Sequence, residues 1–179
     1  MNRHWKGERD MYQIGDRVVY GIHGVCRVEA LEERIVDRKR VTYLALEPVS
    51  KDGSRFLIPT HNEAAMGKIR PMLTVEQWNA LLQPDRIQDS EWIFDDNRRK
   101  QAYRELISGG DREAILKMIC AIYRHKEAQI AAGRKVHQCD DSFLRDAERL
   151  PAGELAVIME TDIPAAIQYL RSKIKKDTL

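Results

Sequence analysis

The chain has 179 residues, and its 30 lysines and arginines are nearly balanced by 28 aspartates and glutamates, which leaves a formal net charge of +2. A chain this close to neutral has no overall basic field, so any contact with nucleic acid must come from a local surface. Cys26, Cys120 and Cys139 form no C-x-x-C pair, which argues against a disulfide framework and favours a reducing compartment. No membrane-length apolar run and no signal peptide occurs, so we expect a cytoplasmic protein that stays out of membranes.

The chain opens with polar residues and then changes to strand-forming ones. Residues 1–10 show no periodicity, and we interpret them as a flexible extension. The Gly-Asp pair at residues 15–16 favours a turn, and the β-branched and aromatic residues 18–20 favour a strand. Gly24 lets the chain reverse before a second apolar run. This pattern predicts the opening hairpin of a small twisted β-barrel.

Further strand signals continue to residue 59. Residues 36–39 supply a turn, and residues 41–46 then alternate with a period of two without a strongly polar face. Residues 56–58 form a last strand, which Pro59 ends because proline cannot donate to a ladder. Four to five short strands joined by hairpin turns favour a barrel over an open sheet.

From residue 74 onwards the signals are helical. Residues 74–82 carry the Thr-x-x-Gln capping box and the apolar face of a short helix. Proline then breaks the periodicity, and we place a linker at residues 84–90. The expected domains are therefore a β-rich domain at residues 11–83 and an all-helical domain at residues 91–179.

The second domain contains four expected helices. Aspartates favour helix N-termini because their side chains cap backbone amides and complement the helix dipole. Such residues precede four apolar-periodic runs, at Asp95, Asp111, Asp140 and Asp162. Pro151 and Gly153 lie inside the third run, where we expect a kink or a break because a mid-helix proline costs about 3 kcal/mol.

Several of these segments together resemble one family. The run GDRVVYGIHGVCRVEALEE, which begins at Gly15 and is followed by YLAL and FLIP, resembles the RNA-polymerase-interacting module of the CarD family. The same module occurs inside bacterial transcription-repair coupling factors. The resemblance covers roughly residues 11–82, and the helical half is similar to the family through RELISGGD, IYRHK and DDSFLRDAERL. It implies an α+β chain in which a small Tudor- or SH3-like β-barrel precedes an all-α helical domain.

The resemblance also implies a polymerase-binding surface on the β-rich domain. In the family, two strand segments border the surface that meets the polymerase β-subunit, where an exposed edge adds to a sheet of the partner. Main-chain bonds give such a contact affinity, and side chains give it specificity. The matching residues here are Arg34, Ile35, Val36 and Leu57. Leu57 stands where other members carry a second arginine.

A basic cluster in the helical half is the candidate DNA-binding site. Arg98, Arg99 and Arg104 form either an ordinary solvated face or a set of phosphate contacts, which would be salt-dependent and largely independent of sequence. The resemblance implies that a tryptophan enters the minor groove at the upstream edge of the melted promoter. Trp92 is the candidate, although it lies six residues before the arginine pair instead of two, and it can also be a domain anchor. Its spacing of seven from Arg99 predicts a shared helical face.

These features favour a binding protein over an enzyme. The sequence has no G-x-S-x-G, no H-E-x-x-H and no phosphate-binding loop, so we expect no catalysis, no cofactor and no metal. We expect a monomeric transcription regulator that binds the RNA polymerase β-subunit and promoter DNA and stabilises the open promoter. One alternative is an adaptor whose helical domain binds another protein. A second is a small metalloenzyme built around His23, Cys26 and His61.

Overall fold

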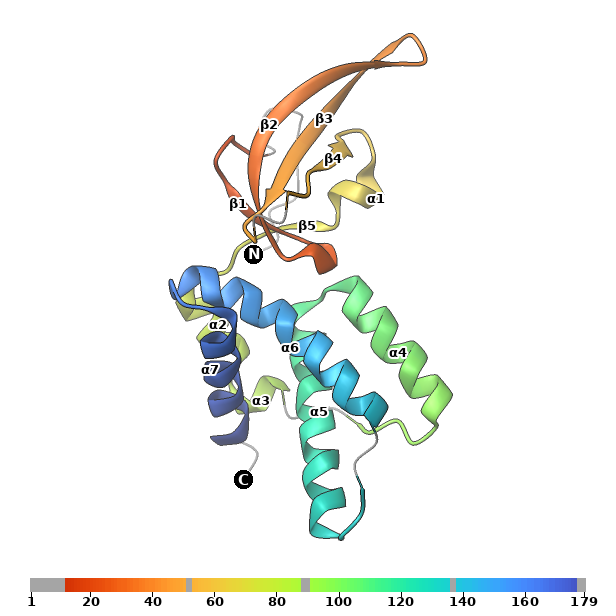
Figure 1. The fold of residues 1–179 in the computed structure, drawn as a ribbon, viewed down its shortest axis with the longest axis vertical. Helices are drawn as coiled ribbons and strands as arrows, with labels where there is room; N and C mark the ends of the chain where they lie inside the picture. Colours follow the sequence, from red (N-terminus) through yellow and green to blue (C-terminus); the bar gives the residue numbers. More distant parts are fainter. Residues whose placement is uncertain (1–11, 51–52, 88–90, 136–137, 177–179) are drawn as a thin grey trace. The chain divides into compact units, whose positions relative to one another are not determined.

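The computed structural model describes four stretches of the chain: residues 12–50, 53–87, 91–135 and 138–176. The expected extension at residues 1–10 lies outside them. The chain divides into two compact units, residues 1–72 and residues 73–179, which we describe separately (Figure 1). The first unit is built on strands and the second on helices.

The first unit is a five-stranded antiparallel sheet with the strand order β4-β3-β2-β1-β5. Its strands are β1 (Arg17–Tyr20), β2 (Val25–Val36), β3 (Lys39–Pro48), β4 (Phe56–Pro59) and β5 (Ile69–Pro71). The 3-10 turn η1 (Gly21–His23) lies between β1 and β2, and the short helix α1 (Glu63–Met66) lies between β4 and β5. The predicted opening hairpin is therefore present as the pair β1 and β2.

The hairpin of β2 and β3 is longer than the short strands that the sequence suggests. β2 has 12 residues and β3 has 10. Asp37 and Arg38 form the two-residue turn between them, with φ angles of 49° and 63°. Positive φ at both positions is what a type I′ turn requires, and this turn matches the twist of the flanking strands. The turn predicted at residues 36–39 is confirmed.

The far half of this hairpin extends past its neighbours in the sheet (Figure 1). β1 pairs with residues 25–27 of β2, and β4 pairs with residues 43–46 of β3. A β-bulge lies between Val28 and Ala30, where two residues of β2 lie opposite one step of β3. The hairpin tip is therefore paired within itself and open on its sides.

The sheet is curled, as expected for a small barrel. Tyr20 in β1 and Phe56 in β4 are separated in the sheet by β2 and β3, yet their ring centroids are 5.5 Å apart. His23 stacks on Tyr20 at 5.2 Å and lies 4.4 Å from the ring of Phe56. The buried core beneath these rings consists of Val18, Cys26, Val28, Leu44, Leu46, Ile58 and Ile69. A Tudor-like β domain followed by helices confirms the predicted α+β fold class.

The second unit contains six helices within the described ranges: α2 (Val75–Leu81), α3 (Pro84–Ile87), α4 (Asp96–Gly109), α5 (Arg112–Ala131), α6 (Gln138–Ile158) and α7 (Ile163–Lys176). Asp95, Asp111 and Asp162 cap α4, α5 and α7, each accepting a bond from the backbone N–H three residues further on. Thr74 and Gln77 form both bonds of the predicted capping box. None of the helices in these ranges is long and apolar enough to cross a membrane.

The boundary between the units lies earlier than the linker expected at residues 84–90. The chain divides after Met72, so α2 and α3 belong to the helical unit. Trp78 of α2 and Ile87 of α3 are both buried in its core. α3 occupies the first part of the expected linker, and the rest of that linker lies outside the described residues. A capping box and an apolar face predict a helix, but they do not identify the surface that covers it.

The break expected at Pro151 and Gly153 is absent, because α6 is one helix across both residues. Pro151 and Ala152 are buried, and this part of α6 packs along α7. Most helical stability in a folded protein comes from packing of an apolar face. Here that packing outweighs the lost backbone bond and the poor helix propensity of proline, so the expected break is wrong, and the alternative of a kink stays a prediction.

Candidate functional site

The sheet brings three of the four residues expected at the docking surface onto one face. Arg34 pairs with residue 41 of β3, and Leu57 pairs with residue 45. Side chains alternate along a strand, so residues 41 and 45 point to the same side, and their paired neighbours Arg34 and Leu57 point to that side too. Val36 lies two residues after Arg34 and shares this side, whereas Ile35 points to the opposite side. The shared side is opposite the one that carries the core residues of β3 and β4.

Tyr43 lies between Arg34 and Leu57 on this face, and it was not among the predicted site residues. The guanidinium carbon of Arg34 is 6.0 Å from the centroid of the Tyr43 ring, in the range of a cation–π contact. The strand register is the signal that identifies Tyr43, because residues 41, 43 and 45 share one side of β3. We call the set Arg34, Val36, Tyr43 and Leu57 the docking face.

A charge cluster at the edge of the docking face orients Arg34. Nη2 of Arg34 donates to Oε2 of Glu32 at 2.9 Å, and the Arg34 side chain remains 49% exposed. Arg55 of the loop before β4 donates to both Glu29 and Glu32. Hydrogen bonds from Arg55, and then from Arg34, hold the pKa of Glu32 below its ordinary value. Glu32 is therefore an ionised acceptor that keeps Arg34 on the docking face.

The backbone of β2 has an open edge beside the docking face. Residues 36 and 39 close the turn as a hydrogen-bonded pair, and in an antiparallel ladder every second pair is bonded. The N–H and C=O groups of residues 31, 33 and 35 therefore point away from β3. The carbonyl of Thr42 agrees with this alternation, because it accepts a bond from Thr60 outside the hairpin at 2.9 Å. Among the described residues no strand pairs with β2 on its outer side beyond residue 27, so a partner strand can add there.

In the helical unit, Arg99 is buried instead of lying on the surface. Its side chain is 3% exposed, and all three guanidinium nitrogens are engaged. Nε donates to Asp140 at 3.0 Å, and Nη2 donates to Asp96 at 2.8 Å. Nη1 donates to the carbonyls of Ile93, at 2.9 Å, and Phe94. Arg99 thus fastens the segment before α4 to the start of α6, an arrangement that argues against the expected phosphate contact, and a DNA contact of Arg99 stays a prediction.

Trp92 belongs to this fastened segment. α4 begins at Asp96, so Trp92 precedes the helix and the predicted shared helical face with Arg99 does not form. The indole stacks on His125 of α5, with centroids 3.7 Å apart and planes at 5°, and the guanidinium carbon of Arg99 lies 4.6 Å from its centroid. Trp92 also packs against the helical core. These contacts fit the anchor alternative, and the minor-groove role of Trp92 stays a prediction.

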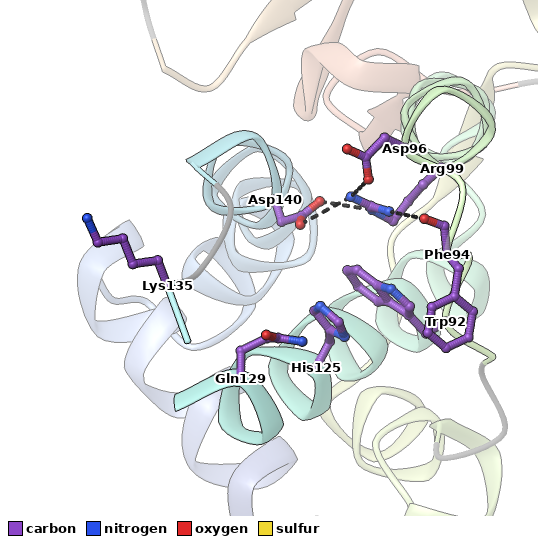
Figure 2. A pocket seen from close by; sticks show the side chains of 8 residues that line it. All are labelled: Trp92, Phe94, Asp96, Arg99, His125, Gln129, Lys135 and Asp140. Carbon is purple, nitrogen blue, oxygen red and sulfur yellow. Dashed lines mark hydrogen bonds and ion pairs between the residues drawn. The ribbon is translucent and has the colours of Figure 1, made fainter. Parts of the chain in front are cut away.

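A pocket of about 210 Å³ opens beside this stack (Figure 2). The segment before α4, the second half of α5 and the start of α6 surround it. Its lining combines aromatic rings with charged and amide groups: Trp92, Phe94, Asp96, Arg99, His125, Gln129, Lys135 and Asp140. Phe94 is 86% exposed, the highest value among the large apolar side chains of the described residues.

The stacked imidazole should make the stability of the helical unit pH-dependent. Burial lowers the pKa of His125 below its ordinary value of 6.5; Asp140 opposes this shift and Arg99 adds to it. The folded protein therefore binds this proton less readily than the unfolded chain does. Stability from neutral His125 is complete above about pH 6.5 and is lost as the pH falls below that value. We expect thermal unfolding midpoints to fall between pH 7 and pH 5, and His125→Gln to remove part of that fall. An identical pH dependence in the variant would contradict this assignment.

Two of the predicted arginines do lie on the surface. Arg98 and Arg104 of α4 are exposed, and neither forms an ion pair with another described residue. Two further exposed arginines, Arg145 and Arg149, lie one turn apart on α6 and were not predicted as site residues. Their spacing of four on the polar face of a predicted helix is the signal that could have identified them.

The structure does not gather the residues of the metalloenzyme alternative into a metal site within the described residues. Within the described residues, no group of three or more His, Cys, Asp and Glu side chains could hold a metal ion. His23 packs its ring against two aromatic rings of the curled sheet. Cys26 is fully buried, and its Sγ lies 3.8 Å from the carbonyl oxygen of Gly24. His23 and Cys26 thus serve the packing of the β unit.

Comparison with protein families places a known domain in the first unit. Residues 12–72 match the family model described as the CarD-like/TRCF RID domain. The matched range ends where the first compact unit ends. It includes the whole docking face and the open edge of β2, and the helices α2 to α7 lie outside it.

Proposed function

The chain carries a CarD-family RNA-polymerase-interacting domain in residues 12–72, and from this premise we propose that it is a bacterial transcription regulator. In this proposal the β unit binds the β-subunit of RNA polymerase, and the helical unit contacts duplex DNA just upstream of the melted promoter. The mechanism is binding without turnover. A protein that binds the open complex more tightly than the closed one by about 1.4 kcal/mol shifts promoter opening tenfold.

The observation that carries the docking proposal is the common face of Arg34, Tyr43 and Leu57 beside an open strand edge, all within the matched domain. A partner strand can gain main-chain bonds along β2, while the docking face selects its side chains. The direct test is titration of the full chain against the isolated β-subunit by calorimetry. We expect saturable binding with one chain per subunit, and absence of binding would overturn the proposal.

The proposed DNA contact uses the exposed arginines of α4 and α6. An arginine that pairs with a phosphate makes binding salt-dependent, so its loss flattens the slope of log affinity against log salt by about one. We expect Arg98→Ala and Arg104→Ala each to do this, with a similar loss of affinity on every duplex sequence. Fluorescence anisotropy with two labelled duplexes of unrelated sequence, at several salt concentrations, measures both quantities.

The matched control for this series is Arg17→Ala. Arg17 is an exposed arginine of β1 in the other unit, so its removal changes net charge equally without touching the proposed surface. It should leave the salt slope unchanged. If Arg98→Ala and Arg104→Ala also left the slope unchanged, the DNA contact would have to be abandoned.

The exposed ring of Phe94 favours a second candidate function, the adaptor. A large apolar side chain that is 86% exposed suits a protein partner as well as a nucleic acid. In that case the β unit would still bind polymerase while the helical unit recruits another protein. The two functions separate in one assay, because only the regulator extends the lifetime of open promoters made from purified polymerase and DNA alone.

A further inference from the structure

The open edge of β2 carries a sequence that is complementary to itself. Residues 31–35 read Leu-Glu-Glu-Arg-Ile, and the N–H and C=O groups of residues 31, 33 and 35 point away from β3. Among the described residues no strand pairs with this edge (Figure 1). An unpaired edge is a template for another strand, and the same strand of a second copy is one such partner.

Two copies of this edge can pair in antiparallel fashion about a two-fold axis at residue 33. Residue 33 then lies opposite residue 33 of the other copy, and residue 31 lies opposite residue 35. These are the residues whose backbone groups point outward, so each pair exchanges both of its N–H···O bonds. An interface of this kind is isologous and closes at two copies.

The charges on the docking face select this register. Glu32 of one copy lies opposite Arg34 of the other, and the same pair forms again across the axis. Both side chains keep exposed surface, 28% for Glu32 and 49% for Arg34. Moving the axis by one residue in either direction would place Glu32 against Glu32 or Arg34 against Arg34. Like charges directly opposite each other destabilise a strand pair.

The other side of the edge brings apolar groups together. Leu31 is 52% exposed and Ile35 is 78% exposed. In the register centred on residue 33, Leu31 of each copy covers Ile35 of the other, and burial of this apolar surface favours association. The cost is one like-charge pair at the axis, Glu33 against Glu33. Arg40 of each chain offsets it, because its Nη1 lies 3.8 Å from Oε2 of Glu33.

From this complementarity we propose that the free chain forms a two-fold symmetric dimer through β2, in which a second copy of the chain occupies the open edge. The interface is small, so the dimer is weak. The same edge and Arg34 are proposed to meet the polymerase β-subunit, so dimerisation and docking exclude each other. That exclusion rests on the proposed function, whereas the dimer does not. The monomer expected from the sequence is then the polymerase-bound form.

The experiment is sedimentation equilibrium of the full chain over a wide range of concentrations, without polymerase. The native chain should dimerise reversibly. Arg34→Glu and Glu32→Lys should each weaken the dimer at least about tenfold, because each puts like charges opposite each other at both symmetric positions. An equimolar mixture of the two variants should dimerise about as well as the native chain, since both positions then hold opposite charges.

Glu33→Gln is the complementary variant. It removes the like-charge pair at the axis, so it should tighten the dimer about threefold. A native chain that stays monomeric at every concentration would overturn the inference. The same holds for a mixture that stays monomeric although both variants keep the far-ultraviolet circular dichroism of the native chain. If either variant fails to fold, Glu33→Gln decides alone, and a dimer that it does not tighten overturns the register.

The exclusion has its own measurement. Adding the isolated β-subunit should convert the dimer into complexes with one chain per subunit. A complex that holds two chains per subunit would overturn the exclusion. Absence of any binding to the β-subunit would instead refute the proposed function and leave the dimer standing, so the two failures are distinguishable.

Discussion

Arg99→Ala is expected to lower the free energy of unfolding of the helical unit by about 3–5 kcal/mol, the usual cost of removing one partner of a buried ion pair. The substitution leaves the Asp140 carboxylate buried without its guanidinium, since Asp140 is only 3% exposed. It also removes the donor to the carbonyls of Ile93 and Phe94. Urea unfolding of the full chain, followed by far-ultraviolet circular dichroism, measures the loss.

The neighbouring Arg98 supplies the matched control for this experiment. Arg98→Ala removes the same side chain one position earlier from an exposed site, so it should change stability by no more than about 0.5 kcal/mol. The double variant Arg99→Met with Asp140→Leu should recover part of the loss, because neither charge is then buried alone. A loss below about 1 kcal/mol in Arg99→Ala would show that the buried pair does not hold the segment before α4.

Arg34→Glu is expected to weaken binding to the polymerase β-subunit by at least about tenfold, because like charges brought together at an interface cost several kcal/mol. The new carboxylate would lie beside Glu32, and the cation–π contact with Tyr43 would be lost. Arg34 is half exposed, so the thermal midpoint of the β unit should change little. Calorimetric titration against the isolated β-subunit measures the affinity.

Arg40→Glu makes the same charge change on the opposite side of the same hairpin. Arg40 pairs with Ile35, whose side chain points away from the docking face. It should therefore leave most of the affinity intact, and Ile35→Ala should have a smaller effect than Arg34→Glu. Equal losses in Arg34→Glu and Arg40→Glu would mean that net charge, and not the docking face, controls binding.

The local elements of this fold are predictable because their signals act within a few residues. The turn at residues 37–38 and the caps at Asp95 and Asp111 each depend on neighbouring backbone groups, and the structure contains all of them. The domain boundary depends on what covers Trp78, and the continuity of α6 depends on what packs against Pro151. In both cases the covering residues come from elsewhere in the chain, so the sequence of the covered segment alone does not reveal them.

The same distinction applies to the candidate site residues. Arg98 and Arg99 are identical neighbours in the sequence, yet one is exposed and the other is buried against Asp140, 41 residues away. No local pattern contains that pairing. Family resemblance identified Arg34 and Leu57, but their common face follows from a strand register that the sequence does not state.

The bulge in β2 affects how the length of this hairpin can vary. Because β2 has one residue more than β3 between Val28 and Ala30, removing one residue there restores regular pairing and leaves Arg34 opposite residue 41. An added residue has no such place, and a shift of one turns every side chain of the tip to the other face. The hairpin can thus shorten by one residue and keep its partner-facing side, but it cannot lengthen by one. This strand accommodates deletion and not insertion.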